Sequence, residues 1–356
     1  MRTQVNRMPK PHRLLPLFAA IVAATLLIVL LASPATLAAQ HPYRVLDRWK
    51  LGGDGGWDYL LVDSPAHRLY LTRGNHVDAV DTRSGKLIGS IGGLHGTHGV
   101  ALDTAGKFGY ISDGGGNAIV VFDRATLATV ATVPAGANPD SIVFDPATQS
   151  VWAFNGRSKD VTVLDAATNK VTATIPLPGK PEFAVTDGKG LIYDNIEDLN
   201  EIVRLDARSL KLTATWTLAE CDGPSGLALD NAGERLFSVC DSKKMAVTDA
   251  KNGKPFATAS IGSGPDAAGW DAADKLAFAS CGEGILSVID ASAPGYPTIE
   301  SLPTQAGART MAYDPATDRI YLVSADFGPR PEPTAANLRP RPPIIPGSFT
   351  VLIVGR

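Results

Sequence analysis

Hydrophobic and polar residues alternate along most of the chain, in short runs that end in aspartate. Residues 100–103 (VALD) are one such run, and a polar turn such as residues 146–148 (PAT) follows the aspartate of another. A stretch rich in aromatic and β-branched residues comes next, as in residues 320–323 (IYLV). Period-two alternation, interrupted by Gly, Pro, Asn and Asp, predicts antiparallel β-strands, whereas helical periodicity is nearly absent after residue 40.

The aspartates recur at nearly constant spacing, in two sets that are about twenty residues apart. The first set is Asp63, Asp103, Asp145, Asp187, Asp230, Asp271 and Asp314. The second set is Asp81, Asp123, Asp165, Asp206, Asp249 and Asp290. A period near 42 residues is typical of a propeller blade with four strands. The sequence therefore predicts an all-β fold, a seven-bladed β-propeller of four-stranded antiparallel blades, in which the regular aspartates are structural.

The two ends of the repeat region complete each other. The last repeat contains only three predicted strands, at residues 310–313, 320–323 and 349–354, whereas residues 43–51 match the fourth-strand pattern and precede the first full repeat. Pairing these ends in one blade closes the ring and removes a free sheet edge. We therefore expect residues 40–356 to form a single propeller whose last blade is closed by the N-terminal strand.

Several blade segments carry a family resemblance. Residues 145–148 (DPAT), the loop at 138–140 (NPD) and residues 163–168 (VLDAAT) are similar to repeats of the bacterial YVTN-repeat (YncE-like) propellers. Residues 70–73 (YLTR) come closest to the four letters of the name, and no repeat contains them in full. The resemblance covers nearly all of the chain after residue 39. It implies a secreted seven-bladed propeller and brings no catalytic residues that can be transferred.

The first 39 residues have the layout of a secretory signal peptide. A basic start without acids precedes an almost wholly apolar run at residues 14–31, and small residues follow at 35–39. We expect cleavage near Ala39 and a periplasmic or secreted protein; the alternative is an uncleaved anchor, the only membrane contact expected, since the run is about long enough to span a bilayer. Without this segment 29 basic and 36 acidic residues remain, a net charge of −7, which predicts no nucleic-acid partner.

The repeat also predicts where a ligand site lies. Loops at one face of a propeller surround the central channel, and loop residues on a rigid scaffold often carry function. The positions five residues before each aspartate of the first set are Asp58, His98, Asp140, Glu182, Ser225, Asp266 and Arg309. We expect them to ring an acidic channel mouth that binds a ligand. The alternative for each carboxylate is that it caps backbone amides of the next strand.

A second polar set lies near the end of each second strand. Its members are Arg73, Ser112, Asn155, Asn195, Cys240, Ser280 and Ser324. Arg73, Asn155 and Asn195 are taken as further ligand-binding candidates on the same face. Trp57, just before Asp58, either stacks on a ligand at the mouth or packs between adjacent blades.

The histidines suggest a possible metal and a possible reaction. His95 and His98 have a His-x-x-His spacing, and both imidazoles could bind one divalent metal alongside Asp58 or Asp140. Alternatively, His98 acts as a general base oriented by Asp58 or Asp140 while Arg309 holds an anionic substrate, which would suit a periplasmic hydrolase or lyase. Motifs of serine hydrolases, zinc proteases and P-loop proteins are absent from the sequence. The first hypothesis is therefore a binding or scaffold protein for a small molecule, peptide or protein.

Two further features lie on the predicted site face. Cys221 and Cys240 fall in the same blade and are expected to form a disulfide, with Cys240–Cys281 as the rival pair. Residues 327–347 contain seven prolines, which favour extended, semi-rigid chain. This loop is either a lid or partner-binding arm over the channel mouth, or a segment packed on the outside of the last blade.

Overall fold

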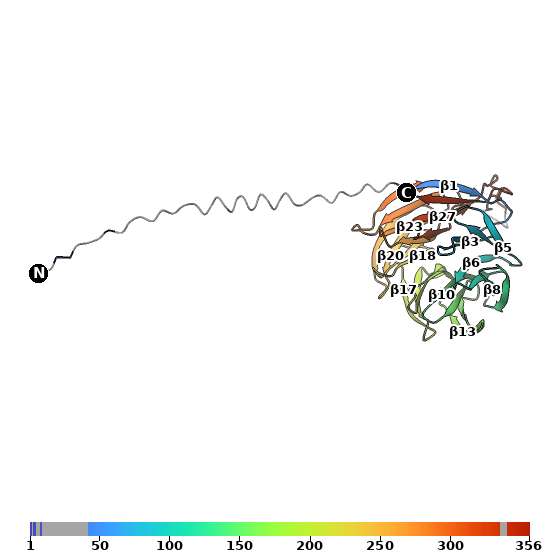
Figure 1. The fold of residues 1–356 in the computed structure, drawn as a ribbon, viewed down its shortest axis with the longest axis horizontal. Coiled ribbons are helices and arrows are strands. Elements are labelled where there is room, and N and C mark those ends of the chain that lie inside the picture. The colour runs from blue at the N-terminus through green and yellow to red at the C-terminus, as the bar shows by residue number, and fades with distance from the viewer. Residues whose placement is uncertain (2, 5–7, 9–41, 335–339) are drawn as a thin grey trace. The chain divides into compact units, whose positions relative to one another are not determined.

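The computed structural model describes residues 1, 3–4, 8, 42–334 and 340–356. Residues 42–356 form one unit of seven four-stranded antiparallel sheets in a ring, a seven-bladed β-propeller, which confirms the predicted fold (Figure 1). The predicted signal segment and its cleavage site lie outside the described residues. Among the described residues, no helix has the length and apolarity needed to cross a membrane.

The four strands of each blade follow one another in sequence from the channel outward, except in blade 7. The inner strands are β2 (Leu60–Asp63), β6 (Thr97–Leu102), β10 (Pro139–Asp145), β14 (Pro181–Thr186), β18 (Pro224–Asp230), β22 (Pro265–Asp271) and β26 (Met311–Asp314). The second strands are β3 (Arg68–Thr72), β7 (Phe108–Asp113), β11 (Ser150–Asn155), β15 (Leu191–Ile196), β19 (Arg235–Cys240), β23 (Leu276–Cys281) and β27 (Arg319–Ser324). The third strands are β4 (Val77–Asp81), β8 (Ala118–Asp123), β12 (Asp160–Asp165), β16 (Glu201–Asp206), β20 (Lys244–Asp249), β24 (Ile285–Asp290) and β28 (Thr350–Gly355). The outer strands are β5 (Leu87–Ile91), β9 (Thr129–Pro134), β13 (Lys170–Pro176), β17 (Lys211–Thr217), β21 (Pro255–Ser260), β25 (Thr298–Pro303) and β1 (Arg44–Lys50).

Blade 7 is completed by the N-terminal strand. β1 pairs antiparallel with β28, and the sheet order is β1-β28-β27-β26. In Figure 1 the blue β1 lies beside the red strands of the C-terminal end. The predicted closure is confirmed, and it leaves the ring without an open inter-blade gap.

The blades are held together by apolar cores between neighbouring sheets. Trp152 and Phe154 of blade 3, for example, pack in one buried cluster with Ile192 and Val203 of blade 4. The second and third strands are covered on both faces, so they are almost continuously apolar, whereas the outer β17 alternates between exposed and half-buried residues. This difference follows from the two-residue period of a strand, because only one face of an outer strand meets a neighbour.

The regular aspartates stabilise turns, as the sequence predicts. The Oδ1 atom of Asp206, at the end of β16, accepts hydrogen bonds from the N–H (2.7 Å) and the hydroxyl (2.9 Å) of Ser209. Asp165 holds Thr168 in the same way in blade 3. Side-chain bonds of this kind fix the tight turn between two strands. The aspartates are therefore regular because each blade needs the same turn.

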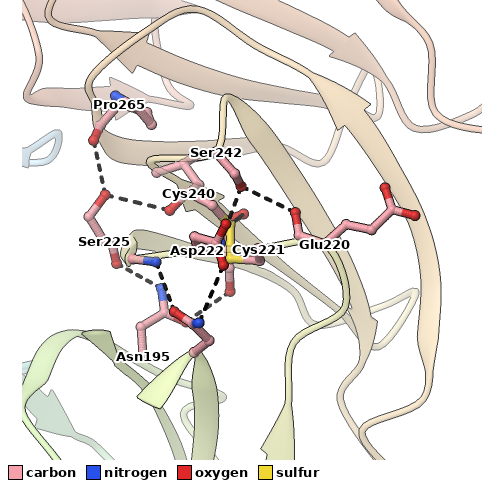
Figure 2. The surroundings of a disulfide bond; sticks show 12 residues. Asn195, Glu220, Cys221, Asp222, Ser225, Cys240, Ser242 and Pro265 are labelled. Carbon is pink, nitrogen blue, oxygen red and sulfur yellow. Dashed lines mark hydrogen bonds between the residues drawn. A yellow bond between two sulfur atoms is a disulfide. The ribbon is translucent and has the colours of Figure 1, made fainter. Parts of the chain in front are cut away.

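A disulfide joins Cys221, in the loop before β18, to Cys240 at the end of β19, with a Cα–Cα distance of 5.3 Å (Figure 2). The expected pair is thus confirmed and the rival pair is not formed, since Cys281 is a buried free thiol. The bond ties the loop that precedes the inner strand of blade 5 to the neighbouring strand.

Candidate functional site at the channel mouth

Five of the seven residues predicted to ring the channel lie in β-bulges at the start of the inner strands, whereas Asp58 and Arg309 precede the regular strands β2 and β26. In blade 3, Pro139 pairs with Asn155 but Ile142 pairs with Ala153, so the two residues between Pro139 and Ile142 face only one on β11. The same shift occurs at the start of β6, β14, β18 and β22. A bulge bends the strand and re-aims its side chains. Here it turns the ring residues toward the central channel.

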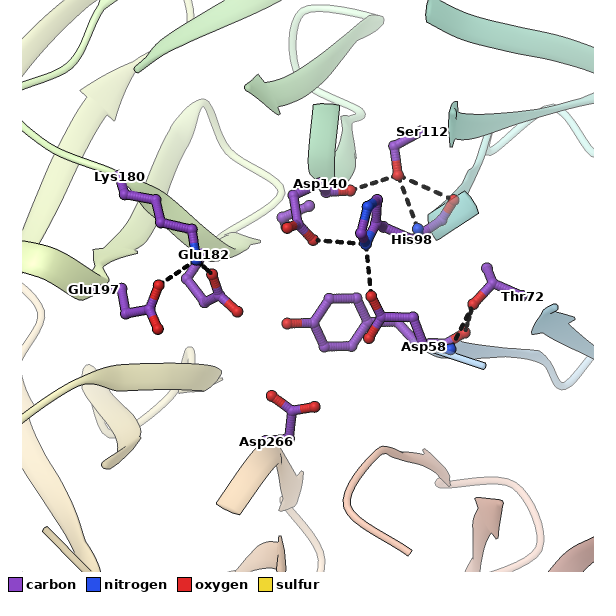
Figure 3. A network of polar contacts seen from close by, with 12 residues as sticks. Asp58, Thr72, His98, Ser112, Asp140, Lys180, Glu182, Glu197 and Asp266 are labelled. Atoms are coloured by element: carbon purple, nitrogen blue, oxygen red, sulfur yellow. Dashed lines mark hydrogen bonds and ion pairs between the residues drawn. The ribbon is translucent and has the colours of Figure 1, made fainter. Parts of the chain in front are cut away.

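Three ring residues from consecutive blades meet at one point. The Nδ1 atom of His98 lies 2.6 Å from Asp58 Oδ2 and 3.6 Å from Asp140 Oδ1 (Figure 3). Ligand atoms of the three side chains all lie within 4.8 Å of one another. The opposite ring nitrogen is packed against Gly114, where an added Cβ would lie 2.7 Å from Nε2. Nδ1 is therefore the nitrogen that His98 presents to the carboxylates.

The opposite side of the mouth carries two further acid–base pairs. Lys180 Nζ lies 2.9 Å from Glu182 Oε2 and also contacts Glu197, which follows β15. Arg309 Nε lies 3.2 Å from Asp266 Oδ2. Figure 3 shows the carboxylate of Asp266 facing the same space as the His98 group from across the channel. Arg309 is thus engaged with an acid rather than free for an anionic substrate.

The bases at the mouth do not neutralise its acids. Burial, partly offset by His98, raises the pKa of Asp140 to about 8, and the nearby charges of Glu182 and Asp58 add to the effect. Burial also raises the pKa of Glu182 to about 7, although Lys180 acts against it. The pKa of Asp266 likewise rises to about 7 through burial, with Arg309 opposing and Asp58 and Asp140 reinforcing. Three carboxyl groups thus hold protons near neutral pH because burial disfavours their charged forms and the neighbouring cations offset burial only in part.

The pKa of His98 is also raised, which for an imidazole favours the charged form. Burial lowers the pKa of its imidazole, but the hydrogen bond to Asp58 and the charge of Asp140 outweigh burial and raise the pKa to about 9. The ring is therefore an imidazolium at neutral pH, paired with Asp58. A protonated His98 is an acid and not a base, so the general-base role considered from the sequence needs the proton to leave first.

Two aromatic residues cross the channel beside the acid ring. Tyr59 of blade 1 and Phe183 of blade 4 touch edge to face, with ring centroids 4.7 Å apart, although their blades are not neighbours. The equivalent positions in the other blades carry small residues, which leaves room for the two rings. These residues are Gly99, Ser141, Gly226, Ala267 and Thr310. The sequence shows that this position of the blade is aromatic in two blades and small in the others, but we did not predict that the two aromatic rings touch.

The Tyr59 hydroxyl lies among the carboxylates. Tyr59 is 6% exposed, and burial followed by the charges of Asp266 and Glu182 raises its pKa well above the ordinary value. Asp58 and Asp140 act on it in the same direction. No hydrogen bond of this hydroxyl is found within residues 42–334 and 340–356. The hydroxyl is therefore a free donor and acceptor near these carboxyl groups.

Asp194 is a buried carboxyl group that the sequence prediction missed. It lies in β15 with 0% exposure, and neither side-chain oxygen has a hydrogen-bond partner among the described residues. Burial raises the pKa of Asp194 well above its usual range, with further contributions from Glu182 and Asp140. Asp194 pairs with Ala184 and Val203, which pack on blade 3, so its side chain lies between blades 3 and 4. The signal was an acid in the middle of the apolar run at residues 191–196.

Other candidate residues have structural partners. The Ser225 hydroxyl donates to Pro265 O at 3.0 Å, and Asn195 donates to Ser225 O at 2.7 Å (Figure 2). Asn155 donates to Asp160 and Thr162 within its own blade. The register divides the second polar set: Asn155 and Cys240 pair with Pro139 and Pro224, whereas Asn195 lies one residue before the partner of Pro181. Adjacent strand residues point to opposite faces, so these residues do not form one ring.

Arg73 and Trp57 belong to the boundary between blades 1 and 7. The Arg73 guanidinium lies 3.6 Å from the ring centroid of Phe349, and Trp57 packs on the same ring at 5.6 Å. His95 is 74% exposed and faces Asp113 at 3.7 Å, while His76 faces Asp78 at 3.5 Å. The structure thus brings His98, but not His95, to the carboxylate group.

The described part of the proline-rich loop folds back on itself. Gly328 N–H donates to Pro343 O and Ile345 N–H donates to Asp326 O, both at 2.8 Å. Its base contacts blade 1, since Gly347 N–H donates to Gly53 O and Phe327 lies 6.2 Å from Trp57. Residues 335–339 are not described, so the lid or arm remains a prediction.

Comparisons with known proteins support the fold. No protein-family model matches the chain, and no curated protein matches it. The structure is similar to a chain of Kuenenia stuttgartiensis hydrazine synthase, with 14% identity and a TM-score of 0.67 over 75% of this chain and 92% of that chain. It is also similar to U3-55K, with 11% identity and a TM-score of 0.70 over 87% of this chain and 98% of that one. At such identities the likeness shows the propeller fold alone, and function must be argued from the site.

Proposed function

We propose that this protein is an extracytoplasmic binding propeller of the YVTN-repeat type, and that its ligand presents positive charge to the acidic channel mouth. The blade motifs and the N-terminal segment support the family and the location, and the Cys221–Cys240 bond fits an oxidising compartment. The binding class rests on one observation, the surplus of carboxyl groups at the mouth.

The surplus is large for so small a region. Three bases, His98, Lys180 and Arg309, lie at the mouth. Six carboxyl groups surround them: Asp58, Asp140, Glu182, Asp194, Glu197 and Asp266. Since three of these acids hold protons near neutral pH, a ligand cation can replace those protons and ionise the carboxyl groups.

Titration with 1,5-diaminopentane tests this proposal. Calorimetry is expected to show binding to the wild type and at least tenfold weaker binding to the double variant Glu182→Gln/Asp266→Asn, because charge-assisted bonds of about 1.5–3 kcal/mol are lost. Two controls are matched to the chemistry: the neutral 1,5-pentanediol, and the variant Asp54→Asn, which removes an exposed acid. Equal binding of diamine and diol, or equal binding by both variants, would refute a cation-binding mouth.

The alternative function, a hydrolase or lyase with a divalent metal, has one observation in its favour. Asp58, His98 and Asp140 together offer a ligand set that suits a metal. Three protein ligands leave a position open for water or substrate, which is the arrangement of catalytic metal sites. Turnover that is lost on chelation and in His98→Gln would support this alternative.

A further inference from the structure

We propose that Asp58, His98 and Asp140 form a site for one divalent first-row metal ion, bound through His98 Nδ1 and one oxygen of each aspartate. This inference rests on the proposed cation-binding mouth and makes it specific. The ligand set differs from the one predicted from the His-x-x-His spacing, which included both His95 and His98, because only His98 reaches the carboxylates.

The distances in the group fit such an ion. Metal bonds of about 2.1 Å to nitrogen and oxygen place tetrahedral ligand atoms about 3.4 Å apart. His98 Nδ1 and Asp140 Oδ1 are already 3.6 Å apart. Nδ1 and Asp58 Oδ2, at 2.6 Å, must separate by about 0.8 Å when the metal replaces the proton between them.

The orientation of His98 also favours Nδ1 as a ligand. Gly114 covers the Nε2 side so closely that any side chain there would collide with the imidazole. The ring therefore cannot turn its other nitrogen into the mouth without moving the loop around Gly114. Carboxylate and imidazole donors suit zinc, iron and manganese, and they do not select the soft ions that prefer sulfur.

One buried carboxyl group outside the triad points to an ion as well. Asp194 carries two oxygens without partners at 0% exposure, and the charges of Glu182 and Asp140 act on it. Buried polar groups are nearly always satisfied in native proteins, and a bound ion is one recognised reason for an exception. A cation held by Asp140 and its partners brings positive charge toward this buried acid.

Calorimetry of purified protein stripped with chelator, titrated with Zn²⁺ alone, tests the site. The expected result is one ion per chain in the wild type and roughly 100-fold or greater loss of affinity in His98→Gln. His95→Gln is the matched control, since it removes a neighbouring exposed histidine, and it is expected to bind Zn²⁺ like the wild type. Circular dichroism establishes that each variant is folded, and the isosteric Asp140→Asn replaces His98→Gln if the latter does not fold.

A Co²⁺ spectrum gives an independent readout of the ligands. Visible absorption bands in the wild type that change in His98→Gln, but not in His95→Gln, would support nitrogen ligation by His98. No Zn²⁺ uptake by the wild type, or equal uptake by His98→Gln, overturns the metal site. The diamine titration of the wild type separates the two proposals: diamine binding without Zn²⁺ binding rejects only the metal site, whereas failure of both rejects the cation-binding mouth.

Discussion

Replacing Asp194 by asparagine is expected to change how the stability of the protein depends on pH. Burial raises the pKa of Asp194 well above the ordinary value, so the folded protein keeps this carboxyl group protonated at pH values where the unfolded chain has lost the proton. In the unfolded chain the group ionises with a pKa near 3.9. Folding must therefore take up a proton at any pH between these two values. The penalty is absent below about pH 4 and grows as the pH rises.

The size of the penalty follows from linkage. One proton taken up on folding lowers the free energy of unfolding by about 1.36 kcal/mol per pH unit. The loss accumulates from about pH 4 upward for as long as the folded carboxyl group keeps its proton, and it is subtracted from the 5–15 kcal/mol that holds a typical domain folded. Asparagine has nearly the same shape and no charge in either state, so Asp194→Asn removes this slope. Any cost of burying its amide without partners adds a constant of about 1–3 kcal/mol.

Urea unfolding at pH 5, 6, 7 and 8 in the presence of chelator measures the effect. The free energy of unfolding of Asp194→Asn minus that of the wild type is expected to rise by about 1.4 kcal/mol per pH unit. Asp54→Asn, which removes an exposed carboxylate, is the control and is expected to show no such slope. A difference for Asp194→Asn that stays constant with pH would show that Asp194 is ionised in the folded protein, and the reasoning would fail.

Three other outcomes are expected. In metal-free protein the His98 imidazole, with its pKa raised to about 9, should titrate near pH 9 in NMR spectra. Because the folded pKa exceeds the unfolded value near 6.5, the stabilisation from the pair with Asp58 is complete below pH 6.5 and is lost as the pH rises through 9. Titration near pH 6.5 would contradict the pairing. The variant Cys221→Ser/Cys240→Ser should lose roughly 3 kcal/mol in urea unfolding and become insensitive to reductant, whereas an unchanged midpoint would show that the disulfide adds no stability. Phe183→Ala should lose about 2 kcal/mol, less than a fully buried phenylalanine, with Phe183→Leu close to the wild type; equal losses in the two variants would mean that the contact with Tyr59 does not depend on volume.

The fold could be predicted because every blade repeats the same local chemistry. The aspartate turns, the alternation of the outer strands and the apolar middle strands are set within a few residues of one another. Closure of the ring could be predicted by counting strands, since the last repeat lacked its fourth strand and an extra strand preceded the first repeat. The disulfide followed from the same count, because Cys221 and Cys240 fall at the same end of one blade.

The site was only partly predictable, since bulges and contacts across the ring do not appear in a linear repeat. Counting back from the aspartates found Asp58, His98 and Asp140, because every blade starts its inner strand alike. The second polar set was chosen by position near the end of each second strand, and its members do not occupy the same register position. Asn155 and Asn195 consequently point to different neighbours. Tyr59 and Phe183 meet only because the ring brings blades 1 and 4 to opposite sides of the channel.

The residues that break the rules of the fold are the ones that mark the mouth. A propeller core needs apolar side chains between blades, yet Asp194 occupies such a position without a partner. Asp140 is buried and Glu182 half-buried at the mouth, both with raised pKa values. Burial of these groups opposes stability, and for Asp194 the apolar Ala153 and Ile111 at matching positions of blades 3 and 2 show that a blade can be built without the acid. Residues that a fold does not favour, such as a buried acid without a partner, are expected at functional sites, where binding is gained at the expense of stability. Their gathering on one side of one channel therefore argues for a ligand more strongly than the acidity of the ring alone.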